Sequence, residues 1–152
     1  MYILKMIKCK CCINSETISK KLSIGEKVVA SILDQMNIFY FYDIQIQDLK
    51  GVKNGYLKFD FLIPRDQKDI DIDNSIAIEY NGIFHYHIIK GKTGKYTLIK
   101  QQMNDYLKND YCLKNDVQIL WIPYWCNIKL IKRMVYDFVC NNVLLEYDNV
   151  LT

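Results

Sequence analysis

Apolar residues recur at helical spacing in residues 24–36, the first clearly patterned stretch of the chain. The residues on the shared face are Val29, Ile32, Leu33 and Met36. Ser23, followed three residues later by Glu26, has the pattern of a capping box, in which each side chain bonds to the other residue's backbone N–H. We therefore predict a helix over residues 24–36. Residues 1–22 lack such a pattern and are expected to form a lead-in to a single domain spanning residues 23–152.

Three stretches with the content of β-strands follow, at residues 38–46, 56–63 and 76–80. Asn54-Gly55 is a tight-turn signal that leads into the second stretch. Strict alternation there predicts two faces. One face carries Leu57, Phe59, Phe61 and Ile63, and the other carries Lys58 and Asp60.

The second half of the chain predicts two further helices and one strand. Residues 95–114 look helical, with an apolar side made of Ile99, Met103, Tyr106 and Leu107. Residues 117–122 are almost all apolar, as expected for a central strand covered on both faces, and residues 127–140 form a last helix. The order helix, three strands, helix, strand, helix predicts an α/β domain with a mixed sheet flanked by helices.

Two acids interrupt the predicted strands. Asp60 lies in the polar phase of its strand, and Glu79 shares its phase with Ala77 and Asn81 in the next. If the two strands pair antiparallel through the 64–74 loop, both carboxylates project from one sheet face near its end. Two such oxygen ligands, completed by water and phosphate, commonly hold Mg²⁺. The same pattern also fits two solvent-facing acids of a half-exposed sheet, and periodicity leaves both interpretations open.

Composition narrows the class of protein. The chain has 152 residues, of which 51% are hydrophobic and 24% charged, which suits one globular domain. A formal net charge of +3 is only mildly basic. The excess of Tyr, Asn, Ile and Lys suits an AT-rich genome, such as that of a virus, phage, mobile element or organelle, and composition does not choose between them. The apolar start, residues 1–7, is too short to span a membrane and lacks a signal-peptide layout, so we expect a soluble, intracellular protein of the cytoplasm or nucleus.

Cysteines and small motifs exclude several classes. Cys9, Cys11 and Cys12 lie close together, but no pair of CxxC elements exists, so the usual spacing of a zinc ribbon is missing. Reduced, packed thiols are the main expectation, and a zinc-stabilised interaction protein is the alternative. No Gly-rich phosphate loop and no Ser-centred nucleophile elbow occurs, so neither a nucleotide cofactor nor serine hydrolase chemistry is expected.

Five short motifs occur in a fixed order between residues 23 and 124. They are Ser23-Ile24-Gly25-Glu26, Phe59-Asp60-Phe61, Ile78-Glu79-Tyr80-Asn81-Gly82-Ile83-Phe84-His85, Gln101–Lys108 and Ile119–Tyr124. In this order and on these elements they resemble the PD-(D/E)XK nuclease superfamily, including its small phage, giant-virus and intron-encoded members. Asp-Phe-x-x-Pro followed by Gly-x-Phe-His is also similar to very-short-patch repair endonucleases.

The resemblance implies a restriction-endonuclease-like core (αβββαβ) and a Mg²⁺-dependent, or Mn²⁺-dependent, DNA endonuclease. Such an enzyme hydrolyses phosphodiester bonds through a metal-activated water, in a site-specific, homing or repair role. Asp60 and Glu79 would be the metal ligands, and Glu26 an outer acid that positions water. The capping role of Glu26 stands beside that role. The partner would be DNA, bound by a nicking monomer or by a homodimer, without a membrane.

The sequence departs from the family pattern at one important place. The lysine expected two residues after Glu79 is Asn81. Gln101 and Lys108, which share a helix face with Asp105, are the predicted replacements. The alternative is an ordinary polar helix surface with an ion pair between Asp105 and Lys108.

Histidines and lysines complete the predicted site. His85 is a candidate for stabilising charge or protonating a leaving oxygen, whereas His87 is expected to make a structural hydrogen bond. The two histidines are expected to alternate across an extended segment. The lysines expected to contact DNA phosphates are Lys58, Lys90, Lys92 and Lys95. Asn81 also supports an alternative function, a catalytically inactive nucleic-acid-binding domain on the same fold.

Overall fold

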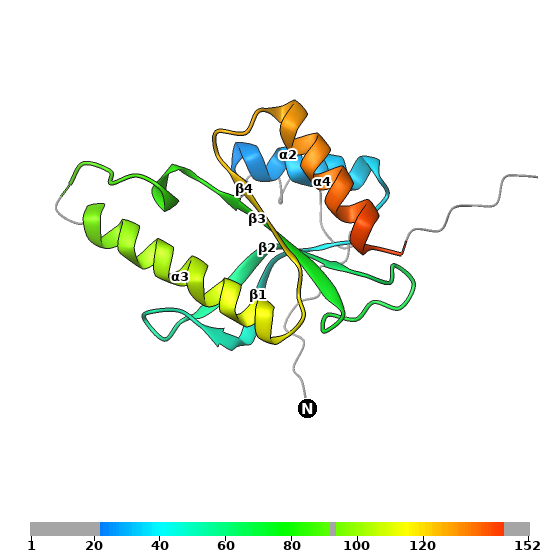
Figure 1. Cartoon of the computed structure of the whole chain (residues 1–152), viewed down its shortest axis with the longest axis horizontal. Helices are drawn as coiled ribbons and strands as arrows, with labels where there is room; N and C mark the ends of the chain where they lie inside the picture. The colour runs from blue at the N-terminus through cyan, green and yellow to red at the C-terminus, as the bar shows by residue number, and fades with distance from the viewer. Residues whose placement is uncertain (1–21, 92–93, 145–152) are drawn as a thin grey trace, which may run out of the picture.

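The computed structural model describes residues 22–91 and 94–144, which form three α-helices, four strands and a short 3₁₀ helix (Figure 1). In chain order these are α2 (Ile24–Gln35), β1 (Phe41–Lys50), β2 (Tyr56–Pro64), β3 (Ser75–Asn81), η1 (Ile83–His85), α3 (Gly94–Lys114), β4 (Ile119–Pro123) and α4 (Ile128–Asn142). The predicted order of helices and strands is confirmed. All but the last residue of the predicted lead-in lies outside the described residues.

The four strands form one mixed sheet in the order β1-β2-β3-β4. β1 and β2 pair antiparallel, β2 and β3 pair antiparallel as expected, and β3 and β4 pair parallel. The prediction that residues 117–122 form a central strand is wrong, because the crossover through α3 places β4 at the edge, beside β3. β3 is the doubly covered strand, and its residues 75–79 are all buried.

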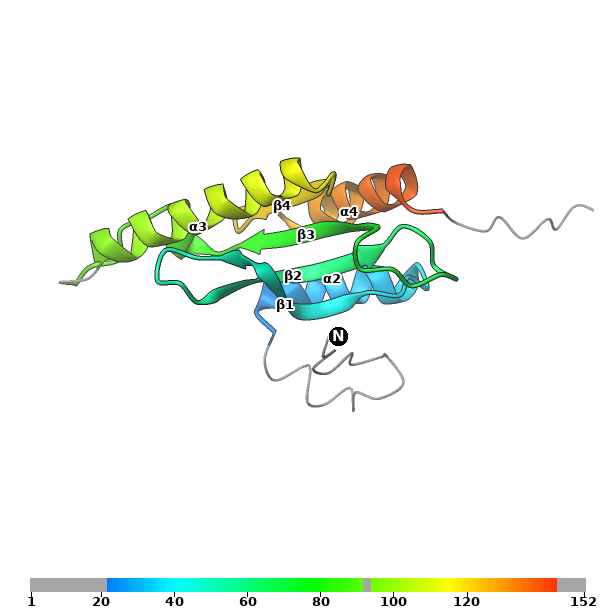
Figure 2. The ribbon, with the colours of Figure 1, turned by 90° about the horizontal axis from the view of Figure 1, so that it is seen from below.

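Helices cover both faces of the sheet, as Figure 1 shows, and Figure 2 shows the same ribbon from below. α2 and α4 lie on one face, where their apolar residues pack with Phe61, Ile63, Ile76, Ile78 and Ile122. α3 lies on the other face, where Cys112 packs with Phe59, Leu62 and Ala77. This second layer is thinner, since α3 buries only three of its residues fully. No helix in the described ranges has the length and apolar character needed to cross a membrane.

The predicted capping box is present at the start of α2. The Ser23 hydroxyl accepts from the Glu26 backbone N–H at 3.3 Å, and the Glu26 carboxylate accepts from the Ser23 N–H at 2.6 Å. Two of the N–H groups that a helix start leaves unpaired are thereby satisfied. The cap fixes where α2 begins and holds Glu26 in the first turn.

Most of the predicted apolar side of α3 does not face the sheet. Ile99, Met103 and Tyr106 are each half exposed or more, and only the fourth member, Leu107, packs on the core beneath the helix. The side toward the sheet combines apolar residues with polar ones such as Asn104, which accepts a hydrogen bond from the Val52 backbone N–H at 3.1 Å. The most apolar stripe of α3 is therefore not the side that it packs against the sheet.

Candidate active site in the fork between β2 and β3

The two central strands separate partway along their length. Pairing between β2 and β3 runs from Pro64↔Ser75 to Phe61↔Ile78 and ends there. Residues 56–60 of β2 continue to follow β1, whereas residues 79–81 of β3 continue to follow β4. We call the opening between these two segments the fork. It divides the sheet into a β1–β2 arm and a β3–β4 arm (Figure 1).

The strand alternation slips where the fork begins. Phe59 packs on the α3 face, but Phe61 packs on the α2–α4 face. The prediction that both share one face is therefore wrong. On the neighbouring strand, Asp43 lies between the partners of these two residues and has a positive φ of 52°, an uncommon conformation for a residue other than glycine. The irregularity thus spans both strands of the β1–β2 arm and lies at the level of Asp60.

Carboxylates replace the missing ladder bonds at the base of the fork. The Asp60 backbone N–H donates to Glu79 Oε1 at 3.0 Å, and the Tyr80 N–H donates to Asp60 Oδ2 at 2.8 Å. A buried N–H without a partner is unfavourable, so these bonds stabilise the strands where they part. The structure therefore brings the two predicted metal ligands side by side.

Lys108 reaches this point from α3. Its Nζ atom lies 2.7 Å from Glu79 Oε2, and the two side chains are only 12% and 3% exposed. The same ammonium lies 5.7 Å from the centroid of the Phe59 ring, within the range of a cation–π interaction. Of the two predicted substitutes for the missing lysine, Lys108 is thus in direct contact with a candidate ligand.

Burial leaves the negative charge of the site poorly compensated. The pKa of Asp60 rises to about 8, chiefly through burial, and further through the charges of Glu79 and Glu26. The Tyr80 N–H and Lys108 act in the opposite direction. The pKa of Glu79 is also raised, because burial outweighs the effect of Lys108. Three carboxylates thus share one neighbourhood with one ammonium.

Glu26 belongs to this neighbourhood although it caps α2. Its charge acts on Tyr42, whose pKa is raised by burial and by several acids, Glu26 the foremost of them. The two bonds between Glu26 and Ser23 establish the capping role. The negative charge of Glu26 also raises the pKa of Asp60. The two roles considered for Glu26 are therefore compatible in space.

Asn81 is buried beside the site in a different setting. Its side chain lowers the pKa of Tyr86, which burial raises, and its Oδ1 atom has no hydrogen-bond partner among the described residues. A buried polar atom without a partner is uncommon and unfavourable. Asn81 therefore offers an inward-facing acceptor but no charge, which agrees with the departure noted in the sequence.

The histidines are held by structural contacts. His85 Nδ1 lies 2.8 Å from Asp105 Oδ2, which ties η1 to α3. His87 Nε2 lies 2.9 Å from the Tyr124 hydroxyl. The expected extended segment is wrong, because His85 ends a 3₁₀ helix and a turn comes next. The alternative of an ion pair between Asp105 and Lys108 is also wrong, since each has another partner.

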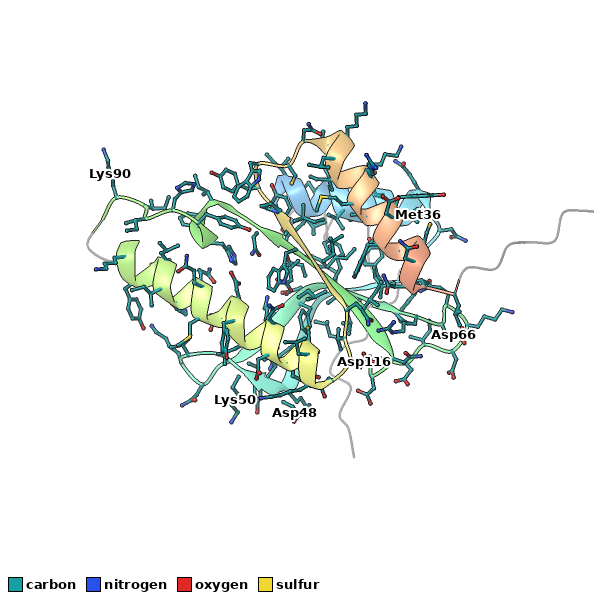
Figure 3. The ribbon with its side chains drawn as sticks, viewed as in Figure 1. Met36, Asp48, Lys50, Asp66, Lys90 and Asp116 are labelled. Atoms are coloured by element: carbon teal, nitrogen blue, oxygen red, sulfur yellow. The ribbon has the colours of Figure 1, made fainter. Side chains whose placement is uncertain are left out.

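Among the described residues, the other predicted site residues form no hydrogen bond or ion pair with the two carboxylates. Within the described residues, Gln101 makes no hydrogen bond to Asp60 or Glu79. Lys58 forms an ion pair with Asp43 at 2.7 Å. Lys90 and Lys95 are exposed, and Figure 3 shows Lys90 pointing outward from the loop before α3. Lys92 lies outside the described residues.

The donor set at the fork suits a divalent cation. Asp60 and Glu79 supply the hard oxygen atoms that Mg²⁺ prefers, and a cation would offset the charge that raises the pKa of Asp60. In the described part of the chain, no three His, Cys, Asp or Glu side chains are grouped to hold a metal ion. Asp60 and Glu79 are therefore the two residues that could hold a cation here, and its remaining positions would be left to water and phosphate.

The cysteines of the described residues are free thiols. Cys112, a residue of α3, is buried, and Cys126 and Cys140 are partly buried. Burial raises the pKa of Cys112 to about 12. The three clustered cysteines, Cys9, Cys11 and Cys12, lie outside the described residues, so the zinc hypothesis stays a prediction.

Sequence reasoning misses two contributors to the site. The pattern assigns Tyr42 only to a strand, yet the charges of Glu26 and Asp60 both act on its hydroxyl. It assigns Phe59 to the core, yet the Phe59 ring lies beneath the Lys108 ammonium. The place of Phe59 on the α3 face depends on the slip at Asp60, and no periodicity in the sequence signals it.

Comparison with protein-family models, with curated proteins and with solved structures gave no match. The function is therefore inferred from the fold and from the geometry of the fork.

Proposed function

We propose that the chain is a metal-dependent DNA endonuclease with a restriction-endonuclease-like core and its active site in the fork. The observation that supports this most is the contact between Lys108 and Glu79 beside Asp60. Two acids on adjacent strands and one lysine are the groups that the family resemblance implies. The lysine comes from α3 instead of the position of Asn81.

Each residue of the fork has a distinct task under this proposal. Asp60 and Glu79 would hold a divalent cation, which lowers the pKa of water and offsets negative charge on a phosphate. Lys108, shielded from solvent, would stabilise the charge that develops on the phosphate during hydrolysis. Glu26 would accept a hydrogen bond from the attacking water, because its carboxylate lies near enough to act on Asp60.

Binding of the DNA backbone would rely on lysines at the ends of the two arms. Lys90 and Lys95 flank the start of α3, and Lys50 lies at the end of β1, where Figure 3 shows it on another side of the molecule. Lysine contacts to phosphates supply affinity without sequence choice. Lys58 contributes less than the sequence suggests, because Asp43 already neutralises it.

The first experiment measures cleavage of supercoiled plasmid and of branched DNA in Mg²⁺ or Mn²⁺. The wild type is compared with Asp60→Asn, Glu79→Gln and Lys108→Met. The matched controls are Asp48→Asn and Lys132→Met, which remove an exposed acid and an exposed lysine. We expect the first three substitutions to abolish cleavage and the two controls to retain it.

The inactive binding domain is the second candidate, and one observation favours it. Glu79 Oε1, Glu79 Oε2 and Asp60 Oδ2 each already have a partner within the protein. Under this alternative the wild type binds DNA but does not cleave it, and Mn²⁺ binding measured by calorimetry is undetectable. Cleavage that is unaffected by all three substitutions would contradict both candidates, because the protein would then be a nuclease whose active site lies outside the fork.

A further inference from the structure

The outer surface of α3 carries a stripe of exposed apolar residues. Its members are Tyr96 at 53% exposed, Ile99 at 55%, Met103 at 50%, Tyr106 at 65% and Leu113 at 81%. We call these five residues the outer stripe. Single exposed apolar residues are ordinary, but a row of them along one helix marks a surface that binds another protein surface.

The spacing of the outer stripe is that of a helix–helix seam. Starting from Tyr96, the steps are three, four and three residues to Tyr106, and Leu113 lies seven residues later. This is the alternating pattern of the a and d positions of a coiled coil, whose narrow seam faces one partner helix. Asp110 occupies the one remaining position of the seam. The pattern therefore predicts another helix as the occupant.

We propose that the outer stripe binds the outer stripe of a second copy of this chain, with the two α3 helices antiparallel. In that arrangement Met103 faces Tyr106 of the second copy, and Tyr96 faces Leu113. The stripe is thus its own complement about a two-fold axis near Asn104 and Asp105. A symmetric dimer needs this self-complementarity, because one patch serves both copies.

Charge selects the antiparallel direction. A parallel pair would place Asp110 against Asp110, and like charges at a seam are unfavourable. The antiparallel pair places Asp110 opposite Ile99 of the second copy, next to Lys100. Asp110 is 39% exposed on the free surface, where it pairs with Lys114 at 2.7 Å. Because the Asp110 carboxylate is accessible on the surface, it can accept the ammonium of Lys100 from the second copy in addition to that of Lys114.

The dimer surface is separate from the fork. Lys108 and Asp105 point to the sheet side of α3, whereas the outer stripe points away from it. Association can therefore be tested without any nuclease assay, and the inference does not depend on the proposed function.

The first test measures the mass of the full chain by sedimentation equilibrium up to about 0.1 mM, a range that covers weak specific dimers. We expect a dimer for the wild type. Ile99→Glu should weaken it on the order of a hundredfold, because a two-fold axis places each substitution in the interface twice. The matched control is Ile128→Glu, which changes an exposed isoleucine on α4 and should leave the dimer intact.

The second test identifies the direction of the helices with a zero-length carbodiimide cross-linker. Lys100 and Asp110 are ten residues apart on one helix, about 15 Å along its axis, so a direct bond between them arises only between copies. We expect this cross-link in the dimer and its loss in Ile99→Glu. The Asp110–Lys114 link within each chain shows that the reagent has worked.

Three outcomes would overturn the proposal. One is a wild type that stays monomeric over the whole range, whether the stripe is bare or covered by another segment of the same chain. Another is a dimer that survives Ile99→Glu, since its interface would then lie elsewhere. The third is a dimer that lacks the Lys100–Asp110 cross-link. The control is the thermal unfolding temperature of Ile99→Glu. If it equals that of the wild type, the loss of the dimer does not result from unfolding of the chain.

Discussion

The Nζ atom of Lys108 lies 2.7 Å from Oε2 of Glu79, although the two residues are 29 positions apart and on different elements. Glu79 belongs to the most buried strand of the sheet, and Lys108 to a helix that covers one face. Neither side chain is well placed alone, because an unpaired charge in such a position is strongly unfavourable. The ion pair therefore has two roles. It holds α3 on the sheet, and both of its members belong to the active site proposed for the fork.

Removing the lysine alone is expected to destabilise the protein. Lys108→Met leaves the Glu79 carboxylate buried without its cation, which typically costs about 3–5 kcal/mol. Urea unfolding at neutral pH measures this loss. The double variant Lys108→Met/Glu79→Gln should recover most of it, because a neutral amide retains the acceptor for the Asp60 N–H. Equal losses in the single and double variants would show that the ion pair is not the cause.

The stability of the metal-free protein should fall as the pH rises. The pKa of Asp60 is about 8 in the folded protein, against an ordinary value of 3.8. The folded state therefore holds this proton where the unfolded chain has lost it. The free energy of unfolding then decreases between about pH 4 and about pH 8 and changes little above that range on this account. Glu79 acts in the same direction.

Asp60→Asn removes this titration. In a chelating buffer we expect the variant to be more stable than the wild type at pH 8 and closer to it at pH 4, as measured by urea unfolding. Asp48→Asn, a change at an exposed acid, should keep the wild-type slope. Adding Mg²⁺ should stabilise the wild type most at pH 8. If the free energy of unfolding falls with pH equally in the wild type and both variants, Asp60 is not the titrating group.

Gly25 allows the close packing of α2 against β3. A methyl group at this position would overlap the ring of Tyr80. Glycine to alanine within a helix ordinarily adds up to about 1 kcal/mol of stability, so the sign of the effect is diagnostic. We expect Gly25→Ala to lower the free energy of unfolding by about 1–3 kcal/mol through overpacking. Gly55→Ala, where the methyl group meets open space, should be close to neutral.

The proposed function predicts that the lysine can be moved back to the strand. Asn81 is on the same strand as Glu79, two residues later, and is buried. In the Lys108→Met background, Asn81→Lys should bring an ammonium to the same neighbourhood and recover part of the metal-dependent cleavage. Plasmid nicking measures this, with Lys108→Met alone as the reference. If the folded double variant recovers no cleavage, the reaction requires that the ammonium come from α3.

The sequence predicts the elements of this fold well because their signals are local. The capping pair Ser23–Glu26 starts α2 where expected, and Asn54-Gly55 lies at the turn before β2. Strand content and the order of the elements are enough to predict an α/β domain. The two acids on β2 and β3 can likewise be found, because each breaks an apolar pattern in its own strand.

The errors arise where tertiary contacts override local pattern. Phe59 and Phe61 are two residues apart, a spacing that predicts one shared face of the strand. In the structure they lie on opposite faces, because the alternation slips at Asp60. The apolar side of α3 is expected to be buried, yet most of it is exposed. The side that faces the sheet also carries the polar groups that bond to Val52, His85 and Glu79. No single-sequence period contains that information.

One helix touches both arms of the fork and its base. Asn104 holds the loop of the β1–β2 arm, Asp105 holds η1 beyond the β3–β4 arm, and Lys108 binds Glu79 between them. These three residues span about 6 Å of helix axis, and a helix resists stretching. These contacts therefore fix how far apart the two arms lie. Any motion that separates the arms further must first break these hydrogen bonds and leave buried polar groups without partners.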